Sequence, residues 1–437
     1  MLNKITTKDT LFNKFIYGQI FSQIGENMSK VSLVWLVMAI SHNNNLVLSF
    51  FVTMQALPPL LFGWIYGHII DEISSRRLLL FVADMFRGII FSLIPLFYFF
   101  HILTTPLLLL LAFIAAISSG IFGPTMFSVI PTFSEDAGPF VKRNSLINIT
   151  GHIGILIGPF LGGILASIFN PAIIVIITGL TFIISAIFMG LIINNQLNSY
   201  LFKIKTYKDF FLEIFTSIKS IKTPYILFKN NAFFSWNLST TTRLFCLMSL
   251  LVGISIGISI TAIPIYVKTT LFNGPAVLGI ILTSGGAGML LMSYLLGKSK
   301  QEFGLLKEET LSIQEIWLTS ALFTSGCLMI PLGLIKNYIL LSFLVFLTSG
   351  FADVYHPVIN TEIQTSVLEK DTGKALTSIG SFFLVGIISG SFISSYLAYK
   401  SGLFIAFIVS GSTIILASLI PMILRTKREY YSVSESK

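Results

Sequence analysis

Ionisable side chains interrupt several long apolar stretches of the sequence, and the first of these stretches carries two. Glu26 and Lys30 lie four residues apart, which places them on one face of a helix, where they can neutralise each other. An ionisable residue in the centre of a bilayer costs at least about 2.5 to 3.5 kcal/mol, so it needs either a partner or a function. Two interpretations of Glu26 stay open: a partner for Lys30, or a group that binds a proton or substrate.

Three later stretches also carry ionisable residues. Asp84 and Arg87 are three residues apart, and we expect them to pair near the cytoplasmic end of their helix. Arg243 is expected at a similar depth, where it either faces a cytoplasmic vestibule or anchors the helix end. Asp353 has no basic residue within one turn and is the second candidate for contact with a proton or substrate. His356 is either a proton relay or a hydrogen-bonded packing residue.

Composition indicates which kind of element must position these residues. The chain has 437 residues, of which 54% are hydrophobic and 11% charged, so a single soluble core could not bury its apolar surface. The net charge of +9 does not indicate a nucleic-acid partner, because the basic residues lie in short loops rather than along one stripe. We therefore expect an all-α membrane protein.

Twelve apolar runs are long enough to span a bilayer as helices, since a span needs about 20 residues. They predict two pseudo-symmetric bundles of six transmembrane helices, comprising residues 1–193 and 237–424. A cytoplasmic linker, 194–236, separates the bundles, and a cytoplasmic tail, 425–437, follows them. The runs lie near residues 12–40, 46–70, 78–100, 106–131, 144–168, 171–193, 237–267, 274–297, 313–335, 338–363, 374–398 and 401–424.

The linker and the loops predict how the chain lies in the membrane. Apolar residues from Tyr207 to Ile221 recur at helical spacing, which is typical of an amphipathic helix on the membrane surface. Most of the 28 lysines and arginines fall in loops on one side of the spans, with only Lys268, Lys336 and Lys400 on the other. By the positive-inside rule, both termini are cytoplasmic. We expect a monomeric, multi-pass protein of the cell membrane.

The two halves of the chain resemble each other. Residues 120–146 align without a gap on residues 350–376, and both segments contain a glycine, a proline-broken membrane helix, an acidic cytoplasmic turn and a basic residue before the next helix. Internal duplication of this kind is found in secondary transporters, which bind substrate near the bilayer midplane where the repeats meet.

The loop after the second run reads "GHIIDEISSRR" and is similar to a loop motif of the major facilitator superfamily, GxxxD followed by a basic cluster. In that superfamily the loop latches the cytoplasmic ends of the two halves. Ser74 stands where the superfamily has a glycine, and Glu72 stands where it has a basic residue. The residues that match the gating-loop motif are Gly67, Asp71, Arg76 and Arg77.

The fifth run contains "GILIGPFLGG", which fits the GxxxGPxxGG pattern of superfamily exporters. Glycines four residues apart on one face let another helix approach closely, and a proline bends the helix. Generic packing is one interpretation, but the repeat-equivalent positions have lost these residues, which favours a role in export. We expect the partner to be the glycine-rich stretch 283–289 on the eighth run. The motif residues are Gly154, Gly158, Pro159, Gly162 and Gly163.

Longer segments of the first half, among them "FSQIGENMSKVSLVWLVM" and "RNSLINITGHIGILIGP", resemble the macrolide-efflux and enterobactin-exporter branch of the superfamily. The resemblance weakens in the second half. It implies a macrolide-like drug or a siderophore as the substrate class, and acidic residues occur at the Glu26 position in these exporters.

These observations predict a secondary active exporter that exchanges protons for an amphipathic organic compound by alternating access. The alternatives are an uptake symporter for a small metabolite and a non-transporting membrane sensor or lipid scramblase. We expect no enzymatic activity, because the sequence shows no catalytic constellation, ATP-binding loop, metal site or cofactor site. The expected partners are a small-molecule substrate, protons and the lipid bilayer.

Overall fold

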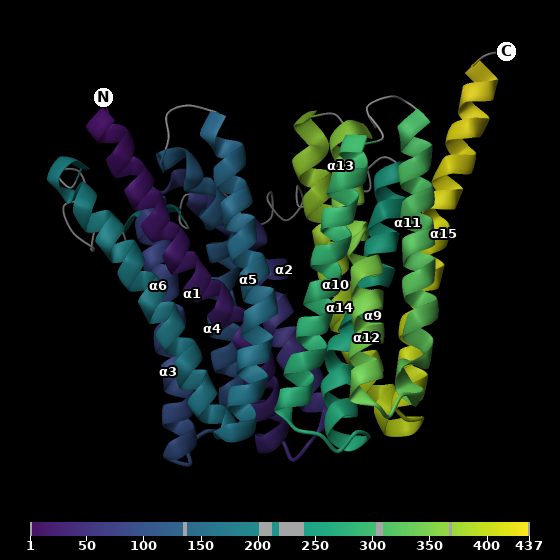
Figure 1. Ribbon diagram of the computed structural model, residues 1–437, viewed down its shortest axis with the longest axis horizontal. Helices are drawn as coiled ribbons and strands as arrows, with labels where there is room; N and C mark the ends of the chain where they lie inside the picture. The colour runs from purple at the N-terminus through teal and green to yellow at the C-terminus, as the bar shows by residue number, and fades with distance from the viewer. Residues whose placement is uncertain are drawn as a thin grey trace. The chain divides into compact units, whose positions relative to one another are not determined.

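Long helices make up the structure, a computed structural model of the whole chain (Figure 1). The residues it describes are 2–133, 138–200, 212–217, 240–302, 309–366 and 369–435, and these contain no β-strand. The chain divides into two compact units. Unit 1 comprises Met1–His42 and Met54–Ile226, and unit 2 comprises Asn43–Thr53 and Leu227–Lys437.

Unit 1 contains six long helices whose apolar sequences match the first six predicted runs. A short 3₁₀ turn, η1, follows α4 near Pro131, because proline lacks the amide hydrogen that an α-helix needs. Ser75 caps the start of α3, where its side chain accepts a hydrogen bond from the Leu78 amide. The elements are α1 (Leu2–Ile40), α2 (Asn45–Glu72), α3 (Arg76–Phe99), α4 (Thr105–Ser128), η1 (Ile130–Phe133), α5 (Gly138–Ile168) and α6 (Pro171–Tyr200).

Unit 2 repeats this order with one additional interruption. The tenth predicted run forms two helices that break at Val354, since Pro357 has no amide hydrogen to donate to the carbonyl oxygen of Asp353, four residues before it. The first turns of α2 belong to this unit, where Ser49 Oγ donates a hydrogen bond to the Ser391 carbonyl oxygen at 2.6 Å. The elements are α9 (Thr240–Thr269), α10 (Pro275–Glu302), α11 (Glu309–Met329), η2 (Ile330–Leu334), α12 (Tyr338–Asp353), α13 (Tyr355–Ser366), α14 (Glu369–Lys400) and α15 (Leu403–Glu435).

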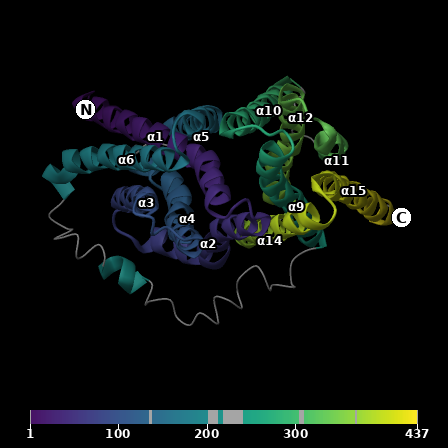
Figure 2. The same cartoon turned by 90° about the horizontal axis from the view of Figure 1, so that it is seen from below.

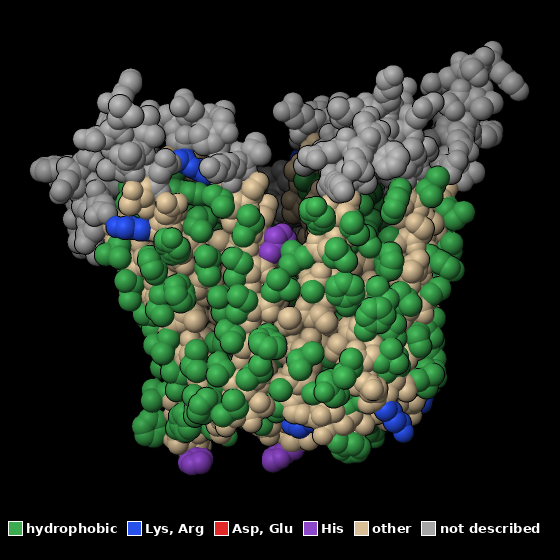
Figure 3. Space-filling view, viewed as in Figure 1, with side chains coloured by type: hydrophobic (Ala, Val, Ile, Leu, Met, Phe, Trp, Pro, Cys, Tyr) green, Lys and Arg blue, Asp and Glu red, His purple; other side chains and the backbone are tan. Residues whose placement is uncertain are grey.

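Eleven spans in the described part of the chain are long and apolar enough to cross a membrane, and they match the second to twelfth predicted runs. The first run forms α1, whose polar residues Gln23, Glu26, Asn27 and Lys30 lower its hydropathy. On the face shown in Figure 3, hydrophobic side chains cover the middle of each unit, and the visible lysines and arginines lie near its ends. The predicted all-α membrane fold is confirmed.

The helices pack in corresponding pairs within each unit (Figure 2). In unit 1, α1 packs against α5 and α6, and α3 packs against α6 and α4. In unit 2, α9 packs against α14 and α15, and α11 packs against α15 and α12. One pair breaks the correspondence: α10 packs closely on α12, whereas α2 and α4 do not approach each other comparably.

Most of the predicted linker, 194–236, lies outside the described residues, although 212–217 are helical. The amphipathic surface helix and the limits of the two bundles therefore stay predictions. The predicted tail, 425–437, begins as a continuation of α15, which runs to Glu435.

Candidate functional site

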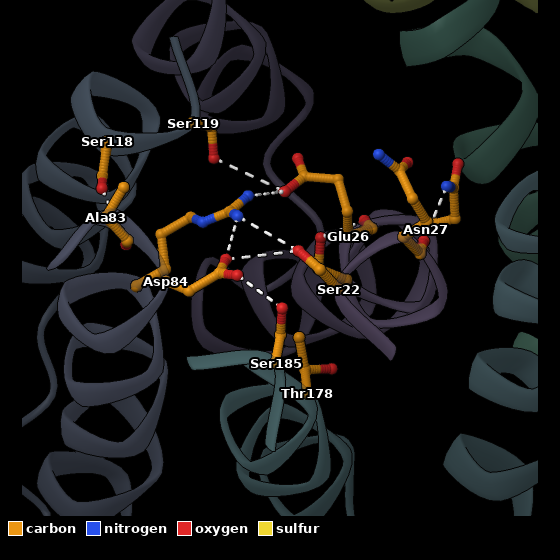
Figure 4. Close-up of polar contacts among 12 residues, drawn as sticks. Ser22, Glu26, Asn27, Ala83, Asp84, Ser118, Ser119, Thr178 and Ser185 are labelled. Carbon is orange, nitrogen blue, oxygen red and sulfur yellow. Dashed lines mark hydrogen bonds and ion pairs between the residues drawn. The ribbon is translucent and has the colours of Figure 1, made fainter. Parts of the chain in front are cut away.

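Three charged side chains from two helices meet inside unit 1. The Arg87 guanidinium on α3 donates a hydrogen bond from Nη1 to Glu26 Oε2 on α1, at 2.9 Å, and from Nη2 to Asp84 Oδ1. Figure 4 shows the Glu26 and Asp84 carboxylates with the dashed contacts that connect each of them to the cluster. The cluster joins α1 to α3, so it is a tertiary feature rather than a pair within one helix.

Serine hydroxyls complete the hydrogen bonding of Asp84, which is fully buried. Ser22 Oγ donates to Asp84 Oδ1 at 3.2 Å, and Ser185 Oγ on α6 donates to Oδ2 at 2.6 Å (Figure 4). Hydrogen bonds from a guanidinium and from hydroxyl groups hold a buried carboxylate in place. Asp84 is therefore the enclosed acid of the cluster, fixed by contacts from three helices.

Aromatic rings enclose the cation of the cluster. The Arg87 guanidinium lies 4.0 Å from the ring centroid of Phe122 on α4 and 4.4 Å from that of Phe182 on α6. A cation over an aromatic face gains about 2 kcal/mol or more when it is shielded from water, as this one is. Arg87 is only 2% exposed, so it does not extend to the membrane surface as an isolated pair near a helix end would.

Glu26 differs from Asp84 in its access to solvent. Its side chain is 39% exposed and lines a cavity of about 180 Å³ between α1, α2, α3 and α4, where Ser119 Oγ also lies 3.4 Å from Oε2. With both acids ionised, the three charged groups carry a net charge of −1. A charge inside a membrane protein is costly, and one bound proton would neutralise the cluster. Glu26 is the carboxylate that a proton can reach.

Lys30 forms its hydrogen bond with Asn27 rather than with Glu26, and the interpretation that Glu26 only compensates the Lys30 charge stays a prediction. The Lys30 ammonium donates a hydrogen bond to Asn27 Oδ1 at 2.8 Å, and the residue is exposed. The physical reason is the competing partner across the helix interface: Arg87 offers Glu26 a charged hydrogen bond in an enclosed place.

Glycines on α5 position the part of α1 that carries Glu26. A Cβ atom at Gly154 would lie 2.6 Å from the Gln23 carbonyl oxygen, and one at Gly158 would lie 2.8 Å from the Ile24 carbonyl oxygen. Gly162 faces Met28 in the same way, with its carbonyl oxygen at 2.8 Å. Only glycine permits this approach of two backbones.

The partner of this glycine face is α1, whereas the sequence predicted the stretch 283–289. That stretch packs within unit 2, where Gly288 faces the Phe346 backbone on α12. Glycines also mediate the α9–α14 contact, since Gly386 faces Leu250 and Ile254. Both repeats thus use glycines for close packing, at different positions. Pro159 and Gly163 are buried beside the motif glycines, and the role of the motif in export stays a prediction.

The two arginines of the gating-loop motif bind the last residue of α4 and the turn η1 that follows it. Arg76 Nη1 donates to the Ser128 carbonyl oxygen at 3.0 Å, and Arg77 Nη2 donates to the Thr132 carbonyl oxygen at 2.7 Å. These contacts secure the loop against η1 within unit 1. Gly67 and Asp71 are exposed.

Ser74, which replaces the superfamily's glycine, has a partner in the linker. Its hydroxyl donates a hydrogen bond to Glu213 Oε2 at 2.8 Å, and Ile214 packs on the apolar cluster around Ile69 and Leu78. The departure from the motif therefore joins the loop to helical residues 212–217.

The candidates in unit 2 form no network comparable to the charge cluster in the described contacts. Asp353 accepts a hydrogen bond from Ser293 Oγ at 2.9 Å, and this pair is exposed. His356 lies against the aromatic rings of Tyr355 and Phe383, with centroids 5.0 and 5.4 Å away. Arg243 is exposed near the start of α9.

Sequence reasoning did not find the uncharged members of the cluster. Ser22 precedes Glu26 by one helical turn, so the spacing i, i+4 was a usable signal. Ser185, Phe122 and Phe182 come from other helices, and no local pattern marks them. The sequence also did not single out Gly25. In the structure, a Cβ atom at this position would overlap with the side chain of Thr181 on α6.

Comparisons with known proteins identify the family and the fold of the chain. The chain belongs to the transmembrane secretion effector family of the major facilitator superfamily, whose pattern matches residues 7–435. It is similar in fold to a POT family transporter solved in complex with 5-aminolevulinic acid (TM-score 0.68, 14% identity, covering 95% of this chain and 96% of that one). A search of curated proteins found no match.

Two further solved structures share the fold. The nucleoside transporter NupG gives a TM-score of 0.67 at 12% identity, covering 94% of this chain and 99% of that one. A bacterial homologue of the iron transporter ferroportin gives a TM-score of 0.65 at 13% identity, covering 94% and 98%. The family match and the apolar spans make the protein a multi-pass membrane transporter rather than an enzyme. Within the described residues, no group of three metal-ligating side chains could hold a metal ion.

Proposed function

We propose that this transporter is a secondary active exporter that exchanges protons for an amphipathic organic compound by alternating access. The observation that carries the proposal is the Glu26–Arg87–Asp84 cluster, in which two carboxylates share one guanidinium. Asp84 is enclosed and fixed, while Glu26 borders a cavity. Glu26 is the group that takes up and releases the proton.

The arrangement gives proton binding a mechanical consequence. When Glu26 is ionised, its bond to Arg87 links α1 to α3; when Glu26 is protonated, that bond loses one of its charges and weakens. Asp84 keeps Arg87 paired in both states, so the guanidinium is never left alone in the membrane. Protonation can therefore loosen α1 against α3 without unfolding the bundle.

Other charged groups near Glu26 are few. Lys30 lies one turn away on α1 and is bonded to Asn27, and α3 supplies only Asp84 and Arg87. From α4 and α6 the described contacts with the cluster come from serine hydroxyls and aromatic rings. The proton balance of the cluster thus depends on these four charged side chains.

The direction of transport and the substrate class rest on other support. The family is described as a secretion effector, which favours export. The resemblance to macrolide and enterobactin exporters favours a macrolide-like drug or a siderophore as the substrate. We also propose Asp353 and His356 as residues that contact the proton or the substrate. We also propose that the protein acts as a monomer in the cell membrane.

Both termini are proposed to be cytoplasmic, on the strength of the loop charges. Asn44 is exposed in the short loop after α1, so Asn44→Cys is expected to react with an impermeant thiol reagent in intact cells. Thr216 is exposed on the linker side, and Thr216→Cys is expected to react only after the cells are opened. Labelling of Thr216→Cys in sealed cells would reverse the proposed orientation.

Glu26→Gln tests the function directly. The amide keeps the volume of the side chain and removes the exchangeable proton, and Arg87 stays paired with Asp84. We therefore expect normal membrane abundance and loss of most export. Accumulation of a radiolabelled macrolide and of a catecholate siderophore is measured in whole cells, with and without a proton uncoupler.

Two variants serve as controls. Lys30→Met removes the neighbouring charge and is expected to leave export largely intact, because Lys30 does not hold Glu26. If the double variant Glu26→Gln, Lys30→Met restores transport, Glu26 is only a charge partner and Asp353 becomes the remaining candidate. Uptake that the uncoupler abolishes would instead indicate a symporter, and no gradient-dependent change with either probe would contradict a proton-coupled exporter of these two classes.

A further inference from the structure

A second cavity lies in unit 1, on three of the four helices that line the cavity beside Glu26. It has a volume of about 490 Å³ and is lined by apolar side chains of α2, α3 and α4, among them Phe62, Ile65, Phe86 and Ile117. Ile214, from the helical residues of the linker, also lines it. Its volume falls within the range of about 300 to 1,000 Å³ that is usual for small-molecule sites.

One polar group in the wall of this apolar pocket is unpaired. The Tyr66 hydroxyl is buried and has no hydrogen-bond partner among the described residues, and the whole residue is 5% exposed. Leaving a buried hydroxyl unpaired costs about 1 to 3 kcal/mol, so such a group calls for a physical explanation.

Tyr66 also lies at the division between the two cavities. A Cβ atom at Gly120 would lie 2.5 Å from the Tyr66 ring and 3.0 Å from its hydroxyl oxygen. Gly120 lines the cavity of Glu26, while Tyr66 lines the apolar pocket. The hydroxyl therefore lies beside Gly120, at the boundary between the apolar pocket and the cavity that contains Glu26.

We propose that this pocket binds the apolar part of an amphipathic organic molecule, and that Tyr66 donates a hydrogen bond to an acceptor atom of that molecule. The inference rests on the proposed function, and it defines the substrate class as a lipophilic compound with an oxygen acceptor next to its apolar body. The polar end of the ligand lies toward Gly120 and the Glu26 carboxylate, which favours a cationic or hydroxyl-rich end.

Direct binding to the purified protein tests this site without requiring transport. The probe is rhodamine 6G, a lipophilic cation with an ester carbonyl, and its fluorescence polarisation is measured with the protein in nanodiscs. Tyr66→Phe removes only the hydroxyl and is expected to weaken binding roughly fivefold, which corresponds to one hydrogen bond of about 1 kcal/mol. Ile117→Trp fills the pocket and is expected to abolish binding.

Matched variants separate binding from folding. Leu110→Trp adds the same bulk to the exposed face of α4 and is expected to bind the probe as the wild type does. Thermal melting of each variant shows whether it is folded. If Tyr66→Phe melts higher and binds the probe normally, the hydroxyl is only an unpaired group and the proposal is wrong.

Other results of these measurements would also overturn the proposed site. No binding to the wild type, or full binding to a folded Ile117→Trp variant, would overturn the site. If, in detergent, added phospholipid raises the melting temperature of the wild type but not of Ile117→Trp, and the probe does not bind, the pocket holds a lipid chain and the proposal is overturned as well. These results are distinct from failure of the proposed function, which appears as accumulation in cells that the uncoupler does not change.

Discussion

The pair α2–α4 in unit 1 and the pair α10–α12 in unit 2 correspond by sequence repeat but pack differently. Gly350 and Gly120 are equivalent positions in the alignment of the halves. A Cβ atom at Gly350 would lie 2.8 Å from the Gly288 backbone oxygen, whereas one at Gly120 would meet the ring of Tyr66. In unit 2 the backbones of α10 and α12 are thus in direct contact, whereas in unit 1 the Tyr66 side chain lies between the backbones of α2 and α4.

This difference explains where the cavities of unit 1 come from. The Tyr66 ring lies between α2 and α4, and side chains of α2, α3 and α4 line both cavities. Duplication provides two similar bundles, and a few side chains decide which pair of helices closes and which stays open. We infer that closure of α10–α12 is structural and that the opening of α2–α4 is functional.

The largest expected effect is at Gly288, where closure is tightest. A Cβ atom there would overlap with the Phe346 carbonyl oxygen, and backbone cannot move aside as a side chain can. Gly288→Ala is expected to destabilise the protein by about 3 kcal/mol. Thermal melting in one detergent measures this, and Gly63→Ala on α2, with nothing within 4 Å of its new Cβ, is the control expected to melt as the wild type does.

A smaller effect compares the two equivalent glycines directly. Gly350→Ala presses on the backbone of α10 and is expected to cost about 2 kcal/mol, while Gly120→Ala presses on a ring that can rotate into a cavity and is expected to cost under about 1 kcal/mol. The same melting assay decides. Equal losses of stability would mean that the Tyr66 ring is held as rigidly as a backbone. The contrast between the open pair α2–α4 and the closed pair α10–α12 would then be wrong.

Much of the fold could be predicted because it depends on local composition. Apolar runs of sufficient length must become helices in a bilayer, where every backbone polar group has to be bonded within its own segment. Pro357 marked the interruption of the tenth span in the same local way. The linker was harder to interpret: Ser74 is an unremarkable loop residue until Glu213 is placed beside it.

The candidate site could be predicted only in part. The sequence identified Glu26, Asp84 and Arg87 as residues that need partners, and it placed Asp84 with Arg87 on one helical face. It could not show that Arg87 also forms an ion pair with Glu26 on α1, nor that the helix packed against Gly158 is α1. Helical spacing describes neighbours within one helix and contains no information about rotation relative to another.

The sequence by itself determined that this chain enters a membrane as helices, that its halves are related, and that buried charges must be satisfied. Those properties follow from hydrophobicity and from the cost of an unpaired charge, which each segment carries alone. Only the tertiary structure decided that Glu26 is bonded to Arg87 while Lys30 is bonded to Asn27, and that the Tyr66 ring lies between α2 and α4. These outcomes depend on which helix faces come together, because hydrogen bonds and close packing act over a few ångströms between segments distant in sequence.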